Sequence, residues 1–323
     1  MERFVFTSQQ ARQFLLQKHG LVGSYRFLGK PGVLSFVRQA GCIQYDPIDV
    51  CGKNAELVLQ SRVPDFSKAL LAELLYEDRS LVDYFDKNLA IFPVEDWRYF
   101  SRTRAHHHAN GRSREAVEAA VPDVIRTIRD KGFVSSKDIQ LSQTVDWSWS
   151  PTSLSRAVLE TLYFRGVLVI HHKRGAQKYY SLSEAHLPVE ILNAPDPNES
   201  EEAFLMWQVR RRIGSVGLLW NRPSDAWLGI DGLKGDVRRR IFEALTTDGV
   251  IFECVVEGLN EKLYLLKEDA ALADAVLAGI SAPKRLEFIA PLDNLLWDRR
   301  LIKALFHFDY KWEIYTPDRK SVV

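Results

Sequence analysis

The stretch PTSLSRAVLETLYFRGVLVIHHKRGAQKYYSL, residues 151–182, carries the clearest local pattern in the chain. Between residues 152 and 165 the apolar side chains recur at helical spacing on one face, and Gly166 is a typical helix stop. Residues 167–182 are typical of two strands that meet at a Lys-Arg-Gly turn. The stretch therefore predicts a helix that leads into a β-hairpin with a basic tip.

The residues just before this stretch extend the pattern. Residues 121–132 predict a helix that accepts Pro122 in its first turn and ends at Gly132, and residues 135–139 predict a short second helix. Three helices followed by a hairpin is the order of a winged helix, whose third helix can lie in a DNA groove. We therefore expect a winged helix over residues 106–190.

The same order of elements returns further along the chain. A helix over residues 201–214 and a second helix through Val237, Ile241 and Leu245 precede a hairpin over residues 250–266. Similar order with little similarity of residues indicates a structural repeat. We expect another winged helix over residues 200–280.

The two ends of the chain are less regular. Helical patterns occupy residues 8–20, 31–41 and 56–84. They predict a further winged-helix-like domain over residues 1–105, whereas residues 286–290 and 304–315 look like strands of a C-terminal β unit over residues 284–323, which we expect to be incomplete. The predicted fold class is mainly α with β (α+β), with tandem winged helix-turn-helix modules and this small β unit.

The composition predicts a globular, cytoplasmic protein with two or three cores. The chain has 323 residues, of which 46% are hydrophobic and 26% charged. No stretch approaches the roughly 20 apolar residues of a membrane span, and the N-terminus lacks an apolar run of signal-peptide length. Cys42, Cys51 and Cys254 have neither disulfide nor zinc-ligand spacing, so we expect them to be buried as small hydrophobic residues.

Basic side chains are clustered although the formal net charge is only +1. Because phosphate contacts come from Lys and Arg, local clusters have to supply the charge that a DNA-binding protein needs. The clusters that lie on expected wings, groove helices or the C-terminal unit are His172, Lys173 and Arg174; Arg238, Arg239 and Arg240; and Arg299 and Arg300. Each cluster taken alone also fits a solvated helix face. We expect the first two clusters to contact phosphates.

Several chemistries have no sequence support. The chain contains no phosphate-binding glycine loop, no HExxH motif and no Ser/His/Asp order. Three consecutive histidines, residues 106–108, lie in a polar, turn-like setting, and consecutive side chains point in different directions. We therefore expect a solvated loop here, and we predict neither a metal nor a cofactor.

Gln44-Tyr45-Asp46 is the sharpest chemical signal. In an extended segment Gln44 and Asp46 share one face, while Ile43 and Tyr45 point to the core. A carboxylate beside an amide suits glycosidic cleavage of a cationic purine, because the carboxylate stabilises an oxocarbenium-like sugar while the amide holds a water or the sugar. A structural role also fits these residues, since Asp46 before Pro47 is typical of a capped strand end.

Three stretches together resemble the AlkZ/YcaQ family of winged-helix DNA glycosylases. They are GCIQYDPI at residues 41–48, IAPLDNLLWDRR at residues 289–300 and FHFDYKWEIY at residues 306–315. The likeness runs from near the N-terminus to about Pro317. It implies three tandem winged helices with a β-barrel-like unit, and monofunctional removal of N7-alkylated purines without metal or cofactor. We expect the partner to be double-stranded DNA and the protein to be a monomer.

The resemblance also assigns roles to residues. The family's catalytic motif is Gln, one residue, then Gln or Asp, and here it is Gln44, Tyr45 and Asp46, similar to the branch associated with unhooking interstrand crosslinks. It also places Arg299 and Arg300 near the site, where we expect them to contact DNA. Two other interpretations remain: a regulator that uses the same winged helices without catalysis, and an inactive truncated relative.

Overall fold

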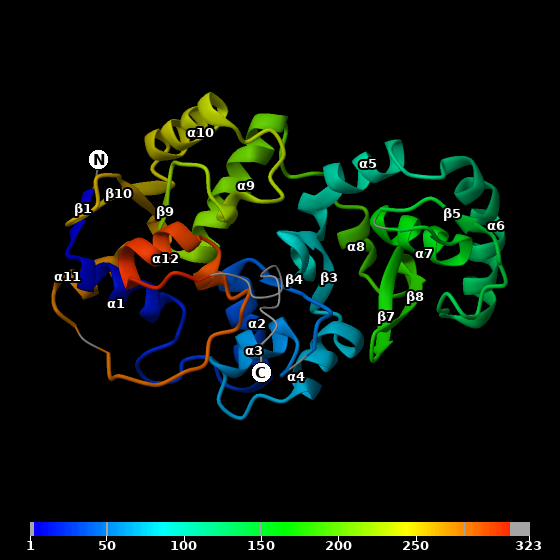
Figure 1. Ribbon diagram of the computed structural model, residues 1–323, viewed down its shortest axis with the longest axis horizontal. Coiled ribbons are helices and arrows are strands. Elements are labelled where there is room, and N and C mark those ends of the chain that lie inside the picture. Colours follow the sequence, from blue (N-terminus) through cyan, green and yellow to red (C-terminus); the bar gives the residue numbers. More distant parts are fainter. Residues whose placement is uncertain (1–2, 50, 149, 281, 311–323) are drawn as a thin grey trace, which may run out of the picture. The chain divides into compact units, whose positions relative to one another are not determined.

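The computed structural model describes residues 3–49, 51–148, 150–280 and 282–310, and it confirms the α+β class (Figure 1). The chain forms two compact units. Unit 1 contains residues 1–67, 86–88 and 201–323, and unit 2 contains residues 68–85 and 89–200. Within the described ranges, no helix has the length and apolar character needed to cross a membrane.

Unit 1 contains a four-stranded sheet in the order β1-β10-β11-β9. The strands are β1 (Arg3–Phe6), β9 (Leu219–Trp220), β10 (Ile251–Val256) and β11 (Leu263–Leu266). β10 and β11 pair antiparallel, which confirms the hairpin predicted over residues 250–266, whereas β1 pairs parallel to β10. The N-terminal strand was not expected from its local sequence.

Unit 1 also contains helices. They are α1 (Ser8–Lys18), α2 (Gly29–Ala40), α3 (Asn54–Gln60), α9 (Glu201–Val216), α10 (Gly235–Thr247), α11 (Ala270–Leu277) and α12 (Arg299–Phe306). Of these, α1, α9 and α10 contact the sheet. α1 packs on α11 and α12, while α2 and α10 pack on α9. The predicted helices over residues 8–20, 31–41 and 201–214 are confirmed with small shifts of their ends.

The ion pair between Arg62 and Asp293 lies inside this core. The guanidinium of Arg62 binds both carboxylate oxygens of Asp293 at 2.8 Å, and both side chains are 0% exposed. Two parallel charge-assisted hydrogen bonds compensate the desolvation of both groups. The pair joins the segment after α3 to the segment before α12.

The C-terminal part of unit 1 differs from the prediction. Residues 286–290 are irregular rather than a strand, and residues 304–306 belong to α12. Asp298 caps α12 because its Oδ1 accepts a hydrogen bond from the Leu301 amide at 2.9 Å, and the helix then buries one apolar face. The predicted strand residues beyond 310 lie outside the described residues.

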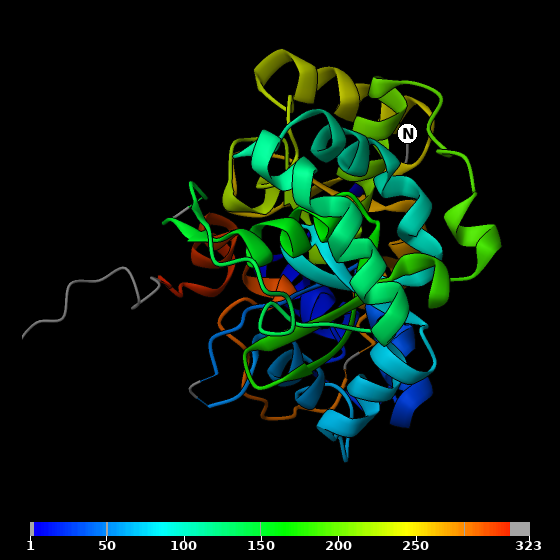
Figure 2. The same cartoon turned by 90° about the vertical axis from the view of Figure 1, so that its right-hand side faces the viewer.

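Unit 2 has a helical part and a hairpin. Its elements include α4 (Lys68–Ala72), most of β3 (Leu81–Asp86) and of β4 (Asn88–Pro93), α5 (Ser101–Ala109), α6 (Arg114–Lys131), β5 (Thr144–Val145), β6 (Thr152–Ser153), α7 (Leu154–Phe164), β7 (Leu168–Arg174), β8 (Gln177–Leu182) and α8 (Val189–Leu192). A π-helical turn (Glu73–Glu77) follows α4, and a 3-10 helix (Val94–Phe100) precedes α5. α6 packs on α7, which leads into the β7–β8 hairpin (Figure 2). The predicted α7 and hairpin are confirmed.

Four local predictions in unit 2 were wrong. α6 begins at Arg114, so Pro122 lies in its interior, because Val117 and Ala120 extend the apolar face upstream. Residues 135–139 form a turn, in which Asp138 accepts the Ser135 amide hydrogen at 2.7 Å. Tyr84 lies in a strand, and residues 106–108 lie in α5, which continues the preceding 3-10 helix.

The cysteines follow the prediction in part. Cys42 and Cys254 are buried, and burial raises the pKa of each thiol to about 12. Cys51 is exposed, since it lies in the irregular segment between β2 (Ile43–Gln44) and α3. The expectation of burial was wrong for Cys51.

Candidate functional site

The segment that carries Gln44 is fixed through its backbone carbonyls. The Cys42 carbonyl accepts a hydrogen bond from the Asn294 side-chain amide, and the Gln44 carbonyl accepts one from Asn54, both at 2.8 Å. Asn54 Oδ1 in turn accepts the Leu292 amide hydrogen at 2.8 Å. Two buried asparagines therefore attach strand β2 to the segment before α12.

Gln44 itself lines a cavity of about 260 Å³. The polar lining residues besides Gln44 are Lys87, Asn88, Asp225 and Arg299, and the apolar ones are Leu228, Pro291, Leu292, Leu296 and Trp297. Gln44 is only 5% exposed, and its Oε1 has no hydrogen-bond donor among the described residues. An unpaired buried amide oxygen costs about 1–3 kcal/mol, so a ligand or water that donates to it is favoured.

Asp46 lies just beyond the strand. Its Oδ1 accepts the Ile48 amide hydrogen at 2.8 Å, an Asx turn that fits the structural role noted for a strand end. Asp46 is half-buried, and it is not among the described residues that line the Gln44 cavity. Ile43 is fully buried as predicted, whereas Tyr45 is half-buried rather than in the core.

Lys87 is a site residue that sequence reasoning missed. It lies in the turn between β3 and β4, is 5% exposed, and places its Nζ 5.2 Å from the centre of the Trp297 ring. Burial, followed by the nearby Arg212, lowers the Lys87 pKa to about 8. A charged residue in a tight turn normally indicates exposure, so no sequence signal marked this lysine.

The turn that carries Lys87 is held from two sides. Asp86 binds Arg211 at 2.7 Å and Arg212 at 3.2 Å, both from α9. Gly229 approaches from the other side, where an added Cβ would lie 2.8 Å from the Asp86 carbonyl oxygen. The position of Lys87 is therefore set by its neighbours in unit 1.

Arg299 and Arg300 begin α12 at the edge of the same site. Arg299 pairs with Asp225 at 2.5 Å, and Arg300 is exposed. Both line a polar hollow of about 300 Å³ together with Pro223, Ser224, Asp225 and Asp298. The structure thus brings Arg299, but not Arg300, to the cavity of Gln44.

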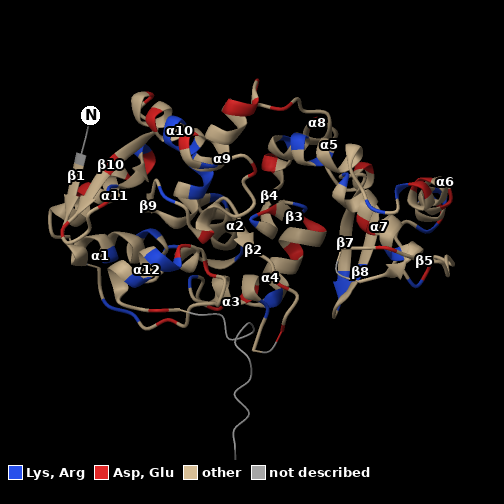
Figure 3. Cartoon of the chain, turned by 45° about the horizontal axis from the view of Figure 1, so that its top comes forward, with Lys and Arg blue, Asp and Glu red and all other residues tan. Residues whose placement is uncertain are grey.

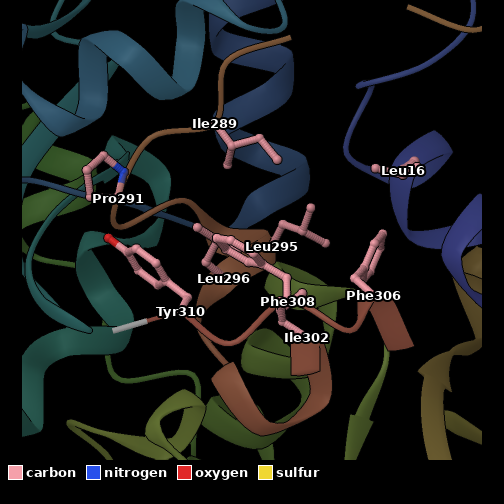
Figure 4. Close-up of a pocket in the computed structure, with 9 residues that line it drawn as sticks. All are labelled: Leu16, Ile289, Pro291, Leu295, Leu296, Ile302, Phe306, Phe308 and Tyr310. Carbon is pink, nitrogen blue, oxygen red and sulfur yellow. The ribbon is translucent and has the colours of Figure 1, made fainter. Parts of the chain in front are cut away.

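A second, apolar cavity adjoins the first and shares Pro291 and Leu296 with it. Its volume is about 580 Å³. Figure 4 shows that its lining side chains are apolar apart from the Tyr310 hydroxyl; the remaining ones are Leu16, Ile289, Leu295, Ile302, Phe306 and Phe308. The partly polar cavity of Gln44 and the apolar cavity therefore meet at Pro291 and Leu296.

The three residues of the cluster on the β7–β8 hairpin differ in how they contact their neighbours. His172 stacks on Tyr179 with ring centroids 4.3 Å apart, and burial followed by Arg174 lowers the His172 pKa. Lys173 forms an ion pair with Asp83, and its side chain is only 8% exposed. Arg174 is exposed and lies 5.4 Å from the centre of the Tyr179 ring. Of the three, Arg174 is the most accessible cation.

The three arginines of α10, which Figure 3 colours blue, also differ in exposure and pairing. Arg238 is buried and donates to the Asn221 side chain at 3.0 Å. Arg239 pairs with Asp236 at 2.7 Å, and Arg240 is exposed. Arg240 is therefore the most accessible cation of this cluster.

The three consecutive histidines serve packing in part. His107 lies 5.8 Å from Phe85 and 5.3 Å from Phe164, measured between ring centroids. In the described ranges, no group of three or more His, Cys, Asp or Glu side chains is arranged to hold a metal ion.

Two comparisons with known proteins bear on this site. A family model described as DNA glycosylase AlkZ-like matches residues 37–323. Among solved structures, the Streptomyces sahachiroi DNA glycosylase AlkZ is similar with a TM-score of 0.56 and 16% sequence identity, over 86% of this chain and 73% of that chain. At this identity the structural likeness establishes a shared fold, and the family match includes Gln44, Lys87 and the start of α12.

Proposed function

The chain belongs to the AlkZ-like family of DNA glycosylases, and from this premise we propose that it hydrolyses the N-glycosidic bond of N7-alkylated purines in double-stranded DNA. The proposed substrates include purines joined in interstrand crosslinks. The base is released to water, and neither metal nor cofactor takes part. We further propose that the protein acts as a monomer in the bacterial cytoplasm, where it would repair nucleoid DNA.

The observation that carries this proposal is the unpaired amide oxygen of Gln44 at the cavity wall. Alkylation at N7 gives the purine a positive charge, so the base is a good leaving group without a strong general acid. The reaction then requires a water that is positioned to attack the sugar. Because a buried amide oxygen accepts hydrogen bonds, Gln44 can hold that water.

Asp46 supplies the negative charge in this proposal. Its Oδ1 is bound to the Ile48 amide, which orients the carboxylate, while no hydrogen bond from the described residues reaches Oδ2. One opposite charge 4 Å from an oxocarbenium-like sugar contributes about 4 kcal/mol at an effective dielectric near 20. That corresponds to roughly three decades of rate.

The proposal is tested with Asp46→Asn and Gln44→Ala on a duplex that contains N7-methylguanine. Asp46→Asn keeps the shape and removes the charge, so single-turnover base release should fall roughly 10²- to 10³-fold. The rate of base release by Gln44→Ala should fall by a similar factor. Asp49→Asn removes a carboxylate from an exposed position three residues away and should release base at the wild-type rate.

If wild type and Asp46→Asn release base at equal rates, Asp46 has no catalytic role and serves only to form its Asx turn. Sequence-selective DNA binding without any base release by the wild type would instead favour the regulator. A duplex with a nitrogen-mustard-type crosslink tests the crosslink part separately, because unhooking yields two separable strands.

A further inference from the structure

We propose that the Lys87 ammonium binds a phosphodiester of the DNA strand whose nucleotide occupies the Gln44 cavity. This inference rests on the proposed function, and it assigns Lys87 a positioning role. The resemblance to the family and the basic clusters of the sequence did not indicate this residue.

Lys87 forms no ion pair with a carboxylate of the described residues. The side chain is 5% exposed, and within the described residues no hydrogen bond or ion pair reaches its Nζ. The Trp297 ring lies near it, with 5.2 Å between Nζ and the ring centre. A buried ammonium without a counter-ion is destabilising. An anion of the substrate that binds to it compensates this desolvation, and this compensation favours binding.

The nearby carboxylates are already committed to arginines. Asp86, next to Lys87 in the turn, binds Arg211 and Arg212 from α9. Asp225, which also lines the cavity, binds Arg299 from α12. Among the described residues, Asp86 and Asp225 therefore raise the Lys87 pKa only from a distance, and neither forms an ion pair with its Nζ.

The remaining titratable neighbour is neutral. Cys42 lies close enough to influence Lys87, but burial raises its pKa to about 12, so the thiol keeps its proton. The three arginines that bind Asp86 and Asp225 outnumber these two carboxylates, so Lys87 adds to a local excess of positive charge. An anion is therefore the ligand that this cavity favours, and in DNA that anion is the phosphodiester.

Binding of a phosphate at Lys87 has a measurable consequence. The pKa of Lys87 is about 8 in the free protein, and a phosphate next to Nζ raises it, so DNA binding above pH 8 must take up a proton. The contribution of Lys87 to DNA affinity is then complete well below pH 8 and is lost as the pH rises above 8. Linkage gives a dissociation constant about tenfold higher at pH 9 than at pH 7.

The experiment measures DNA binding by fluorescence anisotropy between pH 6.5 and 9.5, on a duplex with a stable abasic analogue. The variants are Lys87→Arg, which keeps the charge without titrating, Lys87→Met, which removes it, and Lys303→Met. Lys303 is an exposed lysine of α12 that pairs with Asp309, so its variant controls for loss of one positive charge. Base release is not needed for this measurement.

At pH 7, Lys87→Met should bind roughly tenfold more weakly than wild type, with a salt slope lower by about 1, and Lys303→Met should bind like wild type. Lys87→Arg should retain affinity and lose the decline between pH 7 and pH 9. Lys87→Met should also melt at or above the wild-type temperature, because it removes an unpaired buried charge. A lysine needed only for folding would give a lower melting temperature.

Three results would overturn the inference: equal affinity of Lys87→Met and wild type, identical pH profiles of wild type and Lys87→Arg, or capture of Lys87 on abasic DNA by borohydride. The last result would place a neutral amine at the sugar C1′ instead of a cation at a phosphate. Base release from N7-methylguanine is assayed on the same preparations. If wild type releases base and the Lys87 results are negative, this inference alone fails; if it binds as expected without releasing base, the proposed function fails.

Discussion

His19 is fully buried in unit 1, where its Nε2 donates a hydrogen bond to the Val216 carbonyl at 2.9 Å. Burial, followed by the charge of Arg62, lowers its pKa to about 4 from an ordinary value of 6.5. The folded protein therefore keeps this imidazole neutral at a pH where the unfolded chain protonates it. At the residue scale, His19 makes the stability of unit 1 sensitive to acid.

This sensitivity predicts a difference between wild type and His19→Gln. The unfolded state binds the extra proton between pH 6.5 and pH 4, so the contribution is present above pH 6.5 and is lost as the pH falls through that window. Between pH 7 and pH 4.5 the wild type should lose about 2 kcal/mol more unfolding free energy than His19→Gln. Urea titrations followed by tryptophan fluorescence measure both values.

The glutamine preserves a donor to the Val216 carbonyl, so the comparison isolates the titration. His106→Gln removes an exposed imidazole and should follow the wild-type profile. Parallel acid profiles for wild type and His19→Gln would contradict the assignment of a neutral, buried His19.

At the scale of elements, the turn between β3 and β4 depends on a glycine from another segment. Gly229 has φ +85°, and a Cβ there would lie 2.8 Å from the Asp86 carbonyl oxygen. Gly229→Ala should therefore displace the turn that carries Lys87, with a destabilisation of roughly 1–3 kcal/mol beyond the backbone strain. It should also weaken DNA binding in the anisotropy assay.

Gly258 offers a matched comparison in the β10–β11 turn. Its φ is +83°, nearly that of Gly229, but nothing lies within 4 Å of an added Cβ. Gly258→Ala therefore bears the strain of the positive φ without the collision. Equal melting temperatures and equal DNA affinities for the two variants would show that the Gly229 contact does not hold the turn.

The elements also show how much of the fold local sequence can predict. Helix α7 and the β7–β8 hairpin were predicted because one apolar face, a glycine stop and a turn lie within 32 consecutive residues. Strand β1 was missed because its partner is β10, some 250 residues away, and no local signal encodes a parallel pairing. The strand predicted over residues 286–290 was wrong, since an alternating pattern specifies a strand only where a partner edge is available.

The candidate site shows the same difference between residues that a local sequence signal identifies and residues that only tertiary packing brings together. Gln44 was singled out by its short motif, which is contiguous in the chain. Lys87, Asp225 and Trp297 come from three separate segments, and each has an ordinary structural explanation in its own local sequence. What joins them is tertiary packing, which periodicity and spacing do not encode.

At the scale of the whole molecule, a formal net charge of +1 leaves little general attraction for DNA. Many cations of the basic clusters are neutralised within the protein, as Lys173 is by Asp83 and Arg239 is by Asp236. The exposed cations among the predicted contacts include Arg174, Arg240 and Arg300. DNA affinity should therefore depend on a few accessible side chains, and neighbouring basic residues should differ sharply in their effects.

Arg174 and Lys173 test this difference because they are adjacent in sequence. Arg174→Ala should weaken binding alike for all DNA sequences and lower the salt slope by about 0.9, because one phosphate is no longer neutralised, with an unchanged melting temperature. Lys173→Ala leaves the buried carboxylate of Asp83 without its ion pair, so it should destabilise unit 2 by about 3–5 kcal/mol. Arg126→Ala, which removes an exposed arginine paired with Asp123 on α6, controls for the loss of one charge and should change neither quantity. Salt titrations of DNA binding and thermal melts of the same samples separate the two effects, and a salt slope unchanged in Arg174→Ala would remove the hairpin tip from the DNA contact surface.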